Sequence, residues 1–149
     1  MILSMESIYA RKPLTPLVAK GYQNGLSYGL SNASYDVRIE QSITLWPGRF
    51  VLASTIEVFN MPDDLAAVVM DKSTNARRGL CVQNTFVDPG FRGWLTVELT
   101  NHSWRFIKLE SGDAIAQVVF HQLDKPTKGY SGKYQNQERG AQFPRFSNV

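Results

Sequence analysis

The sequence predicts an all-β protein, a sandwich or barrel of short strands in one domain over residues 1–149. Three observations support this prediction. From residue 35 onward, short apolar or alternating runs recur at regular spacing, as expected for strands with one buried face. Turn segments such as Trp46-Pro47-Gly48 and Asp88-Pro89-Gly90 separate these runs. Val, Ile, Thr and aromatic residues dominate the runs, which favours strands over helices.

The first 34 residues predict a short helix and a loop, and the strands follow. Ser4 stands ahead of Glu6, Ile8 and Ala10, and it is a suitable N-cap for a short helix. Closely spaced glycines and asparagines predict a loop over residues 21–34. The expected strands are Tyr35–Ile39, Ser42–Leu45, Arg49–Phe59, Ala66–Met70, Leu80–Val82, Trp94–Leu99, Arg105–Leu109 and Ala114–Leu123.

The tail over residues 125–149 differs from the rest of the chain. It is rich in glycine and in basic residues and has no sustained apolar period. Two interpretations stay open for it. One is a frayed terminus, and the other is a mobile C-terminal arm that becomes ordered over an anionic ligand.

Composition excludes several classes of protein. Hydrophobic residues make up 43% of the chain, which is enough for a folded core. Cys81, His102 and His121 are the only cysteine and histidines, so a zinc site built from these residue types is not expected. The net charge of +3 is too small to predict a nucleic-acid partner. With neither a signal peptide nor a membrane span in the sequence, we expect a cytoplasmic protein without a membrane partner.

The segment 71–80 concentrates cations and hydroxyls between two apolar runs. Lys72, Ser73, Thr74, Arg77 and Arg78 belong to it. Such side chains beside free backbone N–H groups suit a phosphate chain. Composition alone favours a solvated turn over a phosphate site.

The run Trp94 to Asn101 places one carboxylate among threonines. In a strand, Leu95, Val97 and Leu99 would share one face, and Thr96, Glu98 and Thr100 the other. On composition, Glu98 is a solvent-facing residue of a half-buried sheet. The alternative is a carboxylate that lines a polar pocket, where burial would favour proton transfer.

Two further candidates have ordinary structural explanations. Asp88 opens a turn, where aspartate caps the backbone. Cys81 lies in an apolar run and is expected to be a core thiol rather than a nucleophile.

Four motifs resemble, in order, those of the trimeric dUTPase and dCTP deaminase superfamily. They are Ser34-Tyr35-Asp36-Val37-Arg38, Lys72-Ser73-Thr74-Asn75-Ala76-Arg77-Arg78-Gly79-Leu80, Phe86-Val87-Asp88-Pro89-Gly90-Phe91-Arg92-Gly93 and Gly112-Asp113-Ala114-Ile115-Ala116-Gln117. The resemblance covers about the whole chain and is weakest before residue 30. It implies a distorted jelly-roll β fold, a homotrimer with nucleotide sites between subunits, and Mg²⁺ bound with a triphosphate.

Within this superfamily, three positions resemble the dCTP deaminase branch. That branch uses a glutamate on the strand after the third motif, with a serine and an arginine of the second motif. Glu98, Ser73 and Arg77 match these positions and are therefore the expected catalytic residues. Glu98 would move protons between water and the ring, and Arg77 and Ser73 would orient the water and stabilise developing charge. No zinc is expected, because the zinc deaminase signature is absent.

The resemblance also implies the residues that bind the substrate. Lys72 and Ser73 would contact the phosphates together with Lys133 and Gln137 of the tail, and Tyr130 would replace a tyrosine found further upstream in the family. Asp88 and Phe91 would lie near the deoxyribose. The full expected set is Lys72, Arg78, Asn84, Thr85, Asp88, Phe91, Gln117, Tyr130, Lys133 and Gln137.

Departures from the family pattern leave alternatives open. The segment Cys81–Val87 is shorter than the corresponding deaminase loop. Three consequences stay open: a displaced catalytic water, loss of deamination, or a larger pocket near C5 of the ring, for which 5-methyl-dCTP is a candidate substrate. Asp88 keeps open a dUTP diphosphatase or a bifunctional enzyme, because dUTPases use the aligned aspartate to activate water. A non-catalytic nucleotide-binding regulator is a further alternative. The compact length suits a phage-encoded protein in a host cytoplasm.

Overall fold

The computed structural model describes residues 1–146 and is built mainly from antiparallel strands. Its elements are α1 (Met5–Arg11), β1 (Leu14–Thr15), β2 (Gly21–Gln23), β3 (Leu26–Ser31), β4 (Ser34–Arg38), β5 (Ile43–Leu45), β6 (Phe50–Asn60), β7 (Leu65–Asp71), α2 (Ser73–Arg77), β8 (Leu80–Val82), β9 (Phe86–Val87), β10 (Arg92–Asn101), β11 (Ile107–Leu109) and β12 (Ala114–Gln122). The prediction of an all-β fold is confirmed.

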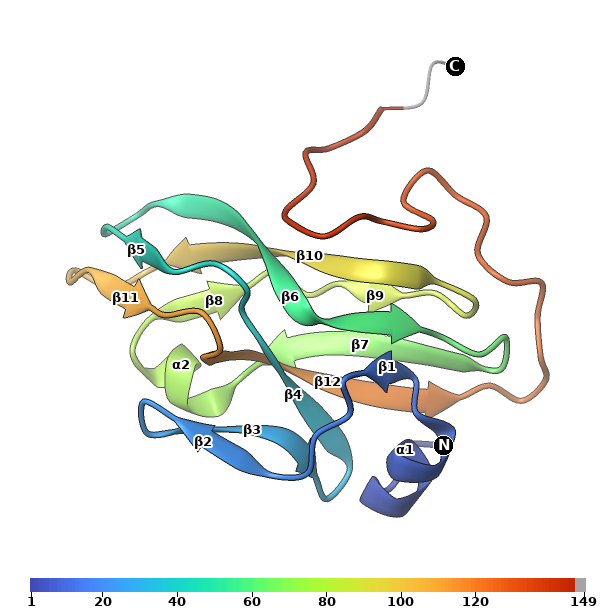
Figure 1. Cartoon of the computed structure of the whole chain (residues 1–149). Coiled ribbons are helices and arrows are strands. Elements are labelled where there is room, and N and C mark those ends of the chain that lie inside the picture. Colours follow the sequence, from blue (N-terminus) through green and yellow to red (C-terminus); the bar gives the residue numbers. More distant parts are fainter. Residues whose placement is uncertain (147–149) are drawn as a thin grey trace.

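The strands form two main layers with the hydrophobic core between them (Figure 1). One sheet has the order β1-β6-β10-β8, and the other has the order β2-β3-β4-β12-β7-β9. A separate two-stranded sheet, β11-β5, lies at one end of the molecule. Phe59 of the first sheet and Tyr35 and Phe120 of the second are fully buried in one shared core. Burial of such rings is the main contribution to the stability of the fold.

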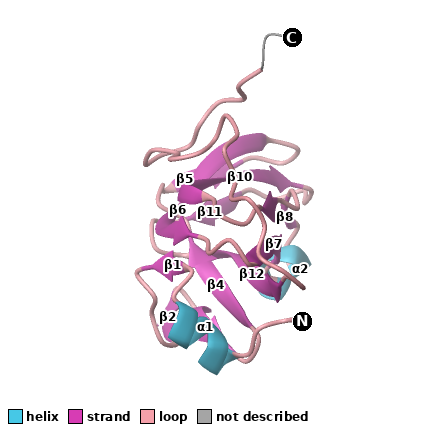
Figure 2. Ribbon diagram, turned by 90° about the vertical axis from the view of Figure 1, so that its right-hand side faces the viewer, coloured by secondary structure: helices cyan, strands magenta, loops and turns pink. Residues whose placement is uncertain are grey.

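Both helices are short and lie at the periphery of the strands (Figure 2). Ser4 caps α1 as predicted, because its hydroxyl accepts from the backbone N–H of Ser7 at 3.4 Å. The segment predicted as a solvated turn after β7 instead forms α2. Asn75 holds this helix in place, because its buried amide donates to the carbonyl of Ala114 at 2.8 Å. No helix of residues 1–146 is long and apolar enough to cross a membrane.

The prediction of a loop over residues 21–34 is wrong. This stretch contains the hairpin β2–β3 and the first residue of β4. Asn24 and Gly25 form its two-residue turn with φ of 49° and 78°, the left-handed conformations that tight hairpins require. Asn-Gly is therefore a hairpin signal here rather than a mark of irregular chain.

The expected arm follows β12 and returns across β10 (Figure 1). Residues 125–146 contain no helix or strand, but they are attached to the sheet at defined points. Gln137 forms an isolated parallel bridge with Gly93, and the N–H of Trp94 donates to its carbonyl at 3.1 Å. Arg139 forms an ion pair with Glu40. Residues 147–149 of the predicted arm lie outside the described residues.

Candidate functional site

A cavity of about 400 Å³ lies between β10, β9 and the arm. Apolar side chains line most of it, including Phe50, Leu52 and Val87. Its polar lining comes from Thr85, Asp88, Thr96, Glu98, Tyr130, Tyr134, Gln137 and Gln142. A small apolar cavity with a few convergent polar groups is the usual form of a small-molecule site.

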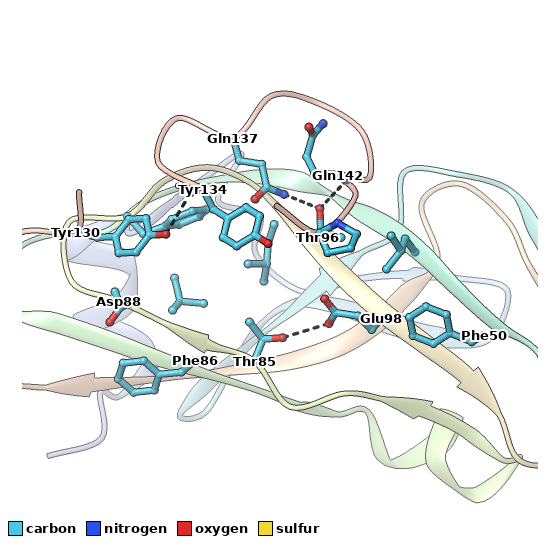
Figure 3. A pocket seen from close by; sticks show the side chains of 15 residues that line it. Phe50, Thr85, Phe86, Asp88, Thr96, Glu98, Tyr130, Tyr134, Gln137 and Gln142 are labelled. Atoms are coloured by element: carbon cyan, nitrogen blue, oxygen red, sulfur yellow. Dashed lines mark hydrogen bonds between the residues drawn. The ribbon is translucent and has the colours of Figure 1, made fainter. Parts of the chain in front are cut away.

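Glu98 stands on the wall of this cavity. The alternation along β10 buries Leu95, Val97 and Leu99 and leaves Thr96 and Glu98 half-buried on the opposite face. The carboxylate Oε2 of Glu98 accepts from the hydroxyl of Thr85 at 3.4 Å (Figure 3). Glu98 therefore lines a cavity rather than an open solvent-facing surface.

The hairpin that leads into β10 shapes one end of the cavity. Asp88 lies exposed at the start of the turn, and its carbonyl accepts from the N–H of Phe91 at 3.2 Å. Phe91 is buried and meets the ring of Tyr130 edge-on, with centroids 6.0 Å apart. Gly90 approaches Gly129 so closely that a Cβ would lie 2.6 Å from its Cα. The turn and the arm thus pack as one wall.

The arm closes the cavity from the side of β10 (Figure 3). The hydroxyl of Thr96 accepts from the side-chain amide of Gln137 and, at 3.0 Å, from the backbone N–H of Gln142. The hydroxyl of Tyr130 accepts from the N–H of Tyr134 at 3.2 Å. These bonds fix the aromatic and amide side chains of the arm above Glu98.

The structure gathers part of the predicted site in this cavity. Thr85, Asp88, Phe91, Glu98, Tyr130 and Gln137 line it together. Ser73, Arg77, Lys72, Arg78, Asn84, Gln117 and Lys133 do not line it. Within one chain, the predicted base is therefore separated from its predicted helpers on α2.

The α2 residues face a different hollow. Arg77 and Arg78 line it together with Arg105 and Lys108 of the β10–β11 turn and β11, and it has no Asp or Glu in its lining. Ser73, the first residue of α2, is exposed. The lining of this hollow is therefore basic, although the net charge of the chain is only +3.

Two of the predicted binding residues have partners inside the chain. The Nζ of Lys72 lies 2.6 Å from Oδ2 of Asp36 and 3.3 Å from the hydroxyl of Ser27. Its charge is thus paired and largely buried. Gln117 of β12 donates to the hydroxyl of Ser34 at 2.9 Å.

Nine residues of the cavity lining were not identified from the sequence as site residues, among them Thr96, Phe86, Tyr134 and Gln142. Phe86 lies within the third motif, and the two-residue period of β10 already places Thr96 on the same face as Glu98, although no role was assigned to it. Tyr134 and Gln142 belong to the arm, whose path is set by tertiary contacts. No local signal could have placed them.

The fold assigns the chain to a class of solved structures. The dUTPase of EIAV is similar with a TM-score of 0.59 and 22% identity, over 78% of this chain and 99% of that chain. A variant dUTPase from phage phi11 of S. aureus, whose structure contains a structural Mg(II) ion, is similar with a TM-score of 0.61 and 15% identity, over 80% of this chain and 95% of that one. The structure is therefore a dUTPase-like β fold.

Sequence comparisons then give the family. A model described as dCTP deaminase-like matches residues 18–123. A dCTP deaminase of Campylobacter concisus (strain 13826) is 32% identical over 91% of this chain and 91% of its own length. A dUMP-forming dCTP deaminase of Kocuria rhizophila is 40% identical over 75% of this chain and 60% of its own length. The chain belongs to the dCTP deaminase-like family and is a hydrolase, as predicted.

Proposed function

We propose that this protein is a dCTP deaminase, which converts dCTP and water into dUTP and ammonia. The observation that carries the proposal is the position of Glu98, whose carboxylate stands on the wall of a small, mainly apolar cavity closed by the arm. Membership of the dCTP deaminase-like family supports the same reaction. An apolar cavity excludes bulk water and so strengthens electrostatic contacts to the reacting ring.

The chemistry needs one group that both accepts and donates a proton. Water attacks C4 of the cytosine ring while a base takes one of its protons, and a proton delivered to N3 makes the ring electrophilic. The C4–O bond forms, the C4–N bond breaks, and the amino group leaves as ammonia after protonation. Glu98 can do each proton transfer in turn, and the hydroxyl of Thr85 orients its carboxylate.

The predicted helpers of Glu98 would come from a second copy of the chain. The cavity lining has two carboxylates, Asp88 and Glu98, but no Lys or Arg, whereas the hollow lined by Arg77 has several cations and no acid in its lining. Opposite charges on two faces of one molecule favour a heterologous contact between copies, which closes into a ring. A homotrimer with sites between subunits would bring Ser73 and Arg77 to Glu98.

Subunit mixing tests this arrangement. Glu98→Ala and Arg77→Ala should each abolish ammonia release, because each removes one half of every site. The Glu98→Ala subunit retains Arg77, and the Arg77→Ala subunit retains Glu98. After random exchange of subunits in a 1:1 mixture, a site is intact when each of these two variants supplies the residue that it retains. About a quarter of the sites then regain both groups. A mixture that stays inactive although mixed oligomers form would contradict a site shared between subunits.

Mg²⁺ enters the proposal as part of the substrate. No three Asp, Glu, His or Cys side chains of residues 1–146 lie close enough to hold an ion by themselves. The triphosphate would supply ligands to Mg²⁺, and the ion would neutralise its charge. Lys133, exposed on the arm, and Ser73 of the neighbouring copy would then bind the phosphates.

A second candidate is further hydrolysis of the product to dUMP and pyrophosphate. Asp88 lies exposed at the rim of the same cavity, and a relative with 40% identity is named as dUMP-forming. Product analysis separates the activities, since ammonia with an intact triphosphate indicates deamination alone. If both occur, Asp88→Asn should remove pyrophosphate release and retain ammonia release.

A finer proposal concerns substituents at C5 of the ring. The short segment between β8 and β9 leaves Phe86 exposed at the edge of the cavity, and the apolar lining suits a methyl group. We therefore expect turnover of 5-methyl-dCTP. Parallel assays of dCTP and 5-methyl-dCTP decide the point, and inactivity on the methylated nucleotide would overturn it.

A further inference from the structure

The short helix α2 carries a single buried side chain. Among its five residues only Asn75 is buried, with 1% of its surface exposed, whereas Ser73 and Arg77 are exposed. An α-helix turns by about 100° for each residue. Ser73 and Arg77, which are four residues apart, therefore share one face of α2, and Asn75 lies on the opposite side. Asn75 thus points inward where Ser73 and Arg77 point outward.

A directed hydrogen bond attaches Asn75 to β12. The pairing of β7 with β12 ends at Asp71 and Ala116, where the chain leaves the sheet and enters α2 (Figure 1). Beyond that point, the side-chain amide of Asn75 donates to the backbone carbonyl of Ala114 at 2.8 Å. A helix of this length has little stability of its own, and Lys72 at its start provides no side-chain cap. The bond to Ala114 therefore fixes the rotation of α2 about its axis.

Stability alone would favour an apolar side chain at this position. The Oδ1 of Asn75 is buried and has no hydrogen-bond partner among residues 1–146. A buried acceptor without a partner destabilises a fold, and an apolar residue of similar volume would avoid that cost. An amide differs from an apolar side chain because its hydrogen bond has a direction. Asn75 is therefore better suited to orienting α2 than to stabilising it.

We propose that Asn75 is a positioning residue, which orients Ser73 and Arg77 toward the reacting groups in a neighbouring copy of the chain. This inference rests on the proposed function, in which Glu98 of one copy meets Ser73 and Arg77 of another. Ser73 begins α2 and Arg77 ends it, so a rotation of the helix displaces both side chains together. Displacement of catalytic groups by about 1 Å lowers turnover roughly 100-fold. Asn75 itself is buried, and it acts through α2 rather than by contact with the substrate.

Two substitutions that remove the amide test this role. Asn75→Ala has no polar group, and the hydroxyl of Asn75→Ser is on a shorter side chain that does not reach the carbonyl of Ala114. In both variants kcat for dCTP should fall roughly 10- to 100-fold. Ser4→Ala is the control, since it removes the cap of α1 and lines neither the cavity nor the basic hollow. It should lower Tm and leave kcat unchanged. Full activity of both Asn75 variants would overturn the proposal.

Subunit mixing separates the positioning role from a merely structural one. An Asn75→Ala subunit should retain a working Glu98 and lack only the α2 half of the site. In a 1:1 mixture with Glu98→Ala, which retains an intact α2, about a quarter of the sites should be restored. In a mixture with Arg77→Ala, none should be restored, because both variants are defective in the same half. A subunit that is damaged throughout would restore activity with neither partner.

The mixture of Glu98→Ala with Arg77→Ala is the reference for these results. If that reference recovers activity, two outcomes overturn the role of Asn75: recovery of Asn75→Ala with Arg77→Ala, or failure of Asn75→Ala to recover with Glu98→Ala. If the reference stays inactive, the shared site is wrong, and the positioning role is wrong with it. Failure of the proposed function itself shows differently, as absence of ammonia release from dCTP by the wild-type protein.

Discussion

Gly93 joins β10 to the arm, and its replacement by alanine should detach the arm from the cavity. Gly93 has φ of 130°, a conformation that side chains rarely adopt. A Cβ at this position would lie 2.5 Å from both the backbone N and the backbone O of Gln137. Because both contacts are with backbone, a rotamer change cannot relieve them. The segment around Gln137 must move away.

The magnitude follows from the bonds that this movement breaks. Displacing Gln137 removes the bond from the N–H of Trp94 to its carbonyl at 3.1 Å and the bond from its amide to Thr96. The neighbouring bond from the backbone N–H of Gln142 to the hydroxyl of Thr96, at 3.0 Å, would break with them, which makes three bonds in total. At about 0.5–1.5 kcal/mol net for each hydrogen bond, docking of the arm loses about 1.5–4.5 kcal/mol. The docked population should fall by roughly one to three powers of ten relative to the open form.

Limited digestion with trypsin measures this change. Lys133 and Arg139 on the arm are exposed, and cleavage after them should accelerate in Gly93→Ala while KM for dCTP rises. Gly48→Ala is the matched control, since Gly48 also has positive φ, at 73°, but a Cβ there would meet nothing within 4 Å. The reasoning is refuted if Gly93→Ala is cleaved as slowly as the wild type.

Three further substitutions test other parts of the structure. Arg38→Met removes the only ion-pair partner described for the fully buried carboxylate of Glu57 and should destabilise the fold by about 3–5 kcal/mol. Burial raises the pKa of Glu57, so the folded protein binds a proton at this carboxylate more readily than the unfolded chain does. The stability of the fold is therefore lost as pH rises through the folded-state pKa. The difference in Tm between wild type and Arg38→Met should be larger near pH 8 than near pH 5. Phe91→Ala should lower the free energy of unfolding by about 3–5 kcal/mol and release the ring of Tyr130, measurable by denaturant unfolding and by trypsin. Asn101→Ala removes a buried amide that donates to two carbonyls at 2.9 and 2.7 Å, and a loss of about 2–3 kcal/mol in denaturant unfolding is expected; an unchanged midpoint would contradict the role assigned to those bonds.

Strand β10 shows how much of the site could be predicted from the sequence. Its alternation of apolar and polar residues gives the buried and open faces directly, because a strand has a period of two. The same period places Thr96 and Glu98 side by side. These residues face a cavity only because β9 and the arm, which lie elsewhere in the sequence, form its other walls. Alternation alone cannot distinguish a cavity wall from a solvent-facing surface.

The hairpin β2–β3 was missed because its glycines resemble those of a loop. Gly25 supplies the positive φ of a two-residue turn, whereas Gly21 and Gly29 have a different role. A Cβ at Gly21 would lie 2.4 Å from the ring of Tyr28, and one at Gly29 would lie 2.0 Å from the carbonyl of Ala19. These glycines permit close packing within and beside the strands. Packing demands of this kind arise from tertiary structure and leave no periodic pattern in the sequence.

The predicted base and its helpers illustrate a different limit. Sequence motifs identify residues that act together, but they do not tell whether one chain or two supply them. In this fold, β10 presents Glu98 on one face, while Asn75 pins α2, with Ser73 and Arg77, to β12 of the other sheet. Glu98 and Arg77 line separate hollows. In the proposed site, a second copy of the chain would supply the residues that one chain does not bring together.

The division of the cavity between sheet and arm has a consequence for kinetics. Glu98 and Thr96 stand on a strand whose other face is buried in the core, so their positions vary little. Tyr130, Tyr134 and Gln137 belong to the arm, which is attached by a few hydrogen bonds. A rigid strand suits proton transfer, which requires accurate geometry, and a detachable arm suits substrate entry and product release. Substitutions at Glu98 should therefore act mainly on kcat, and those that loosen the arm, Gly93→Ala included, should act mainly on KM.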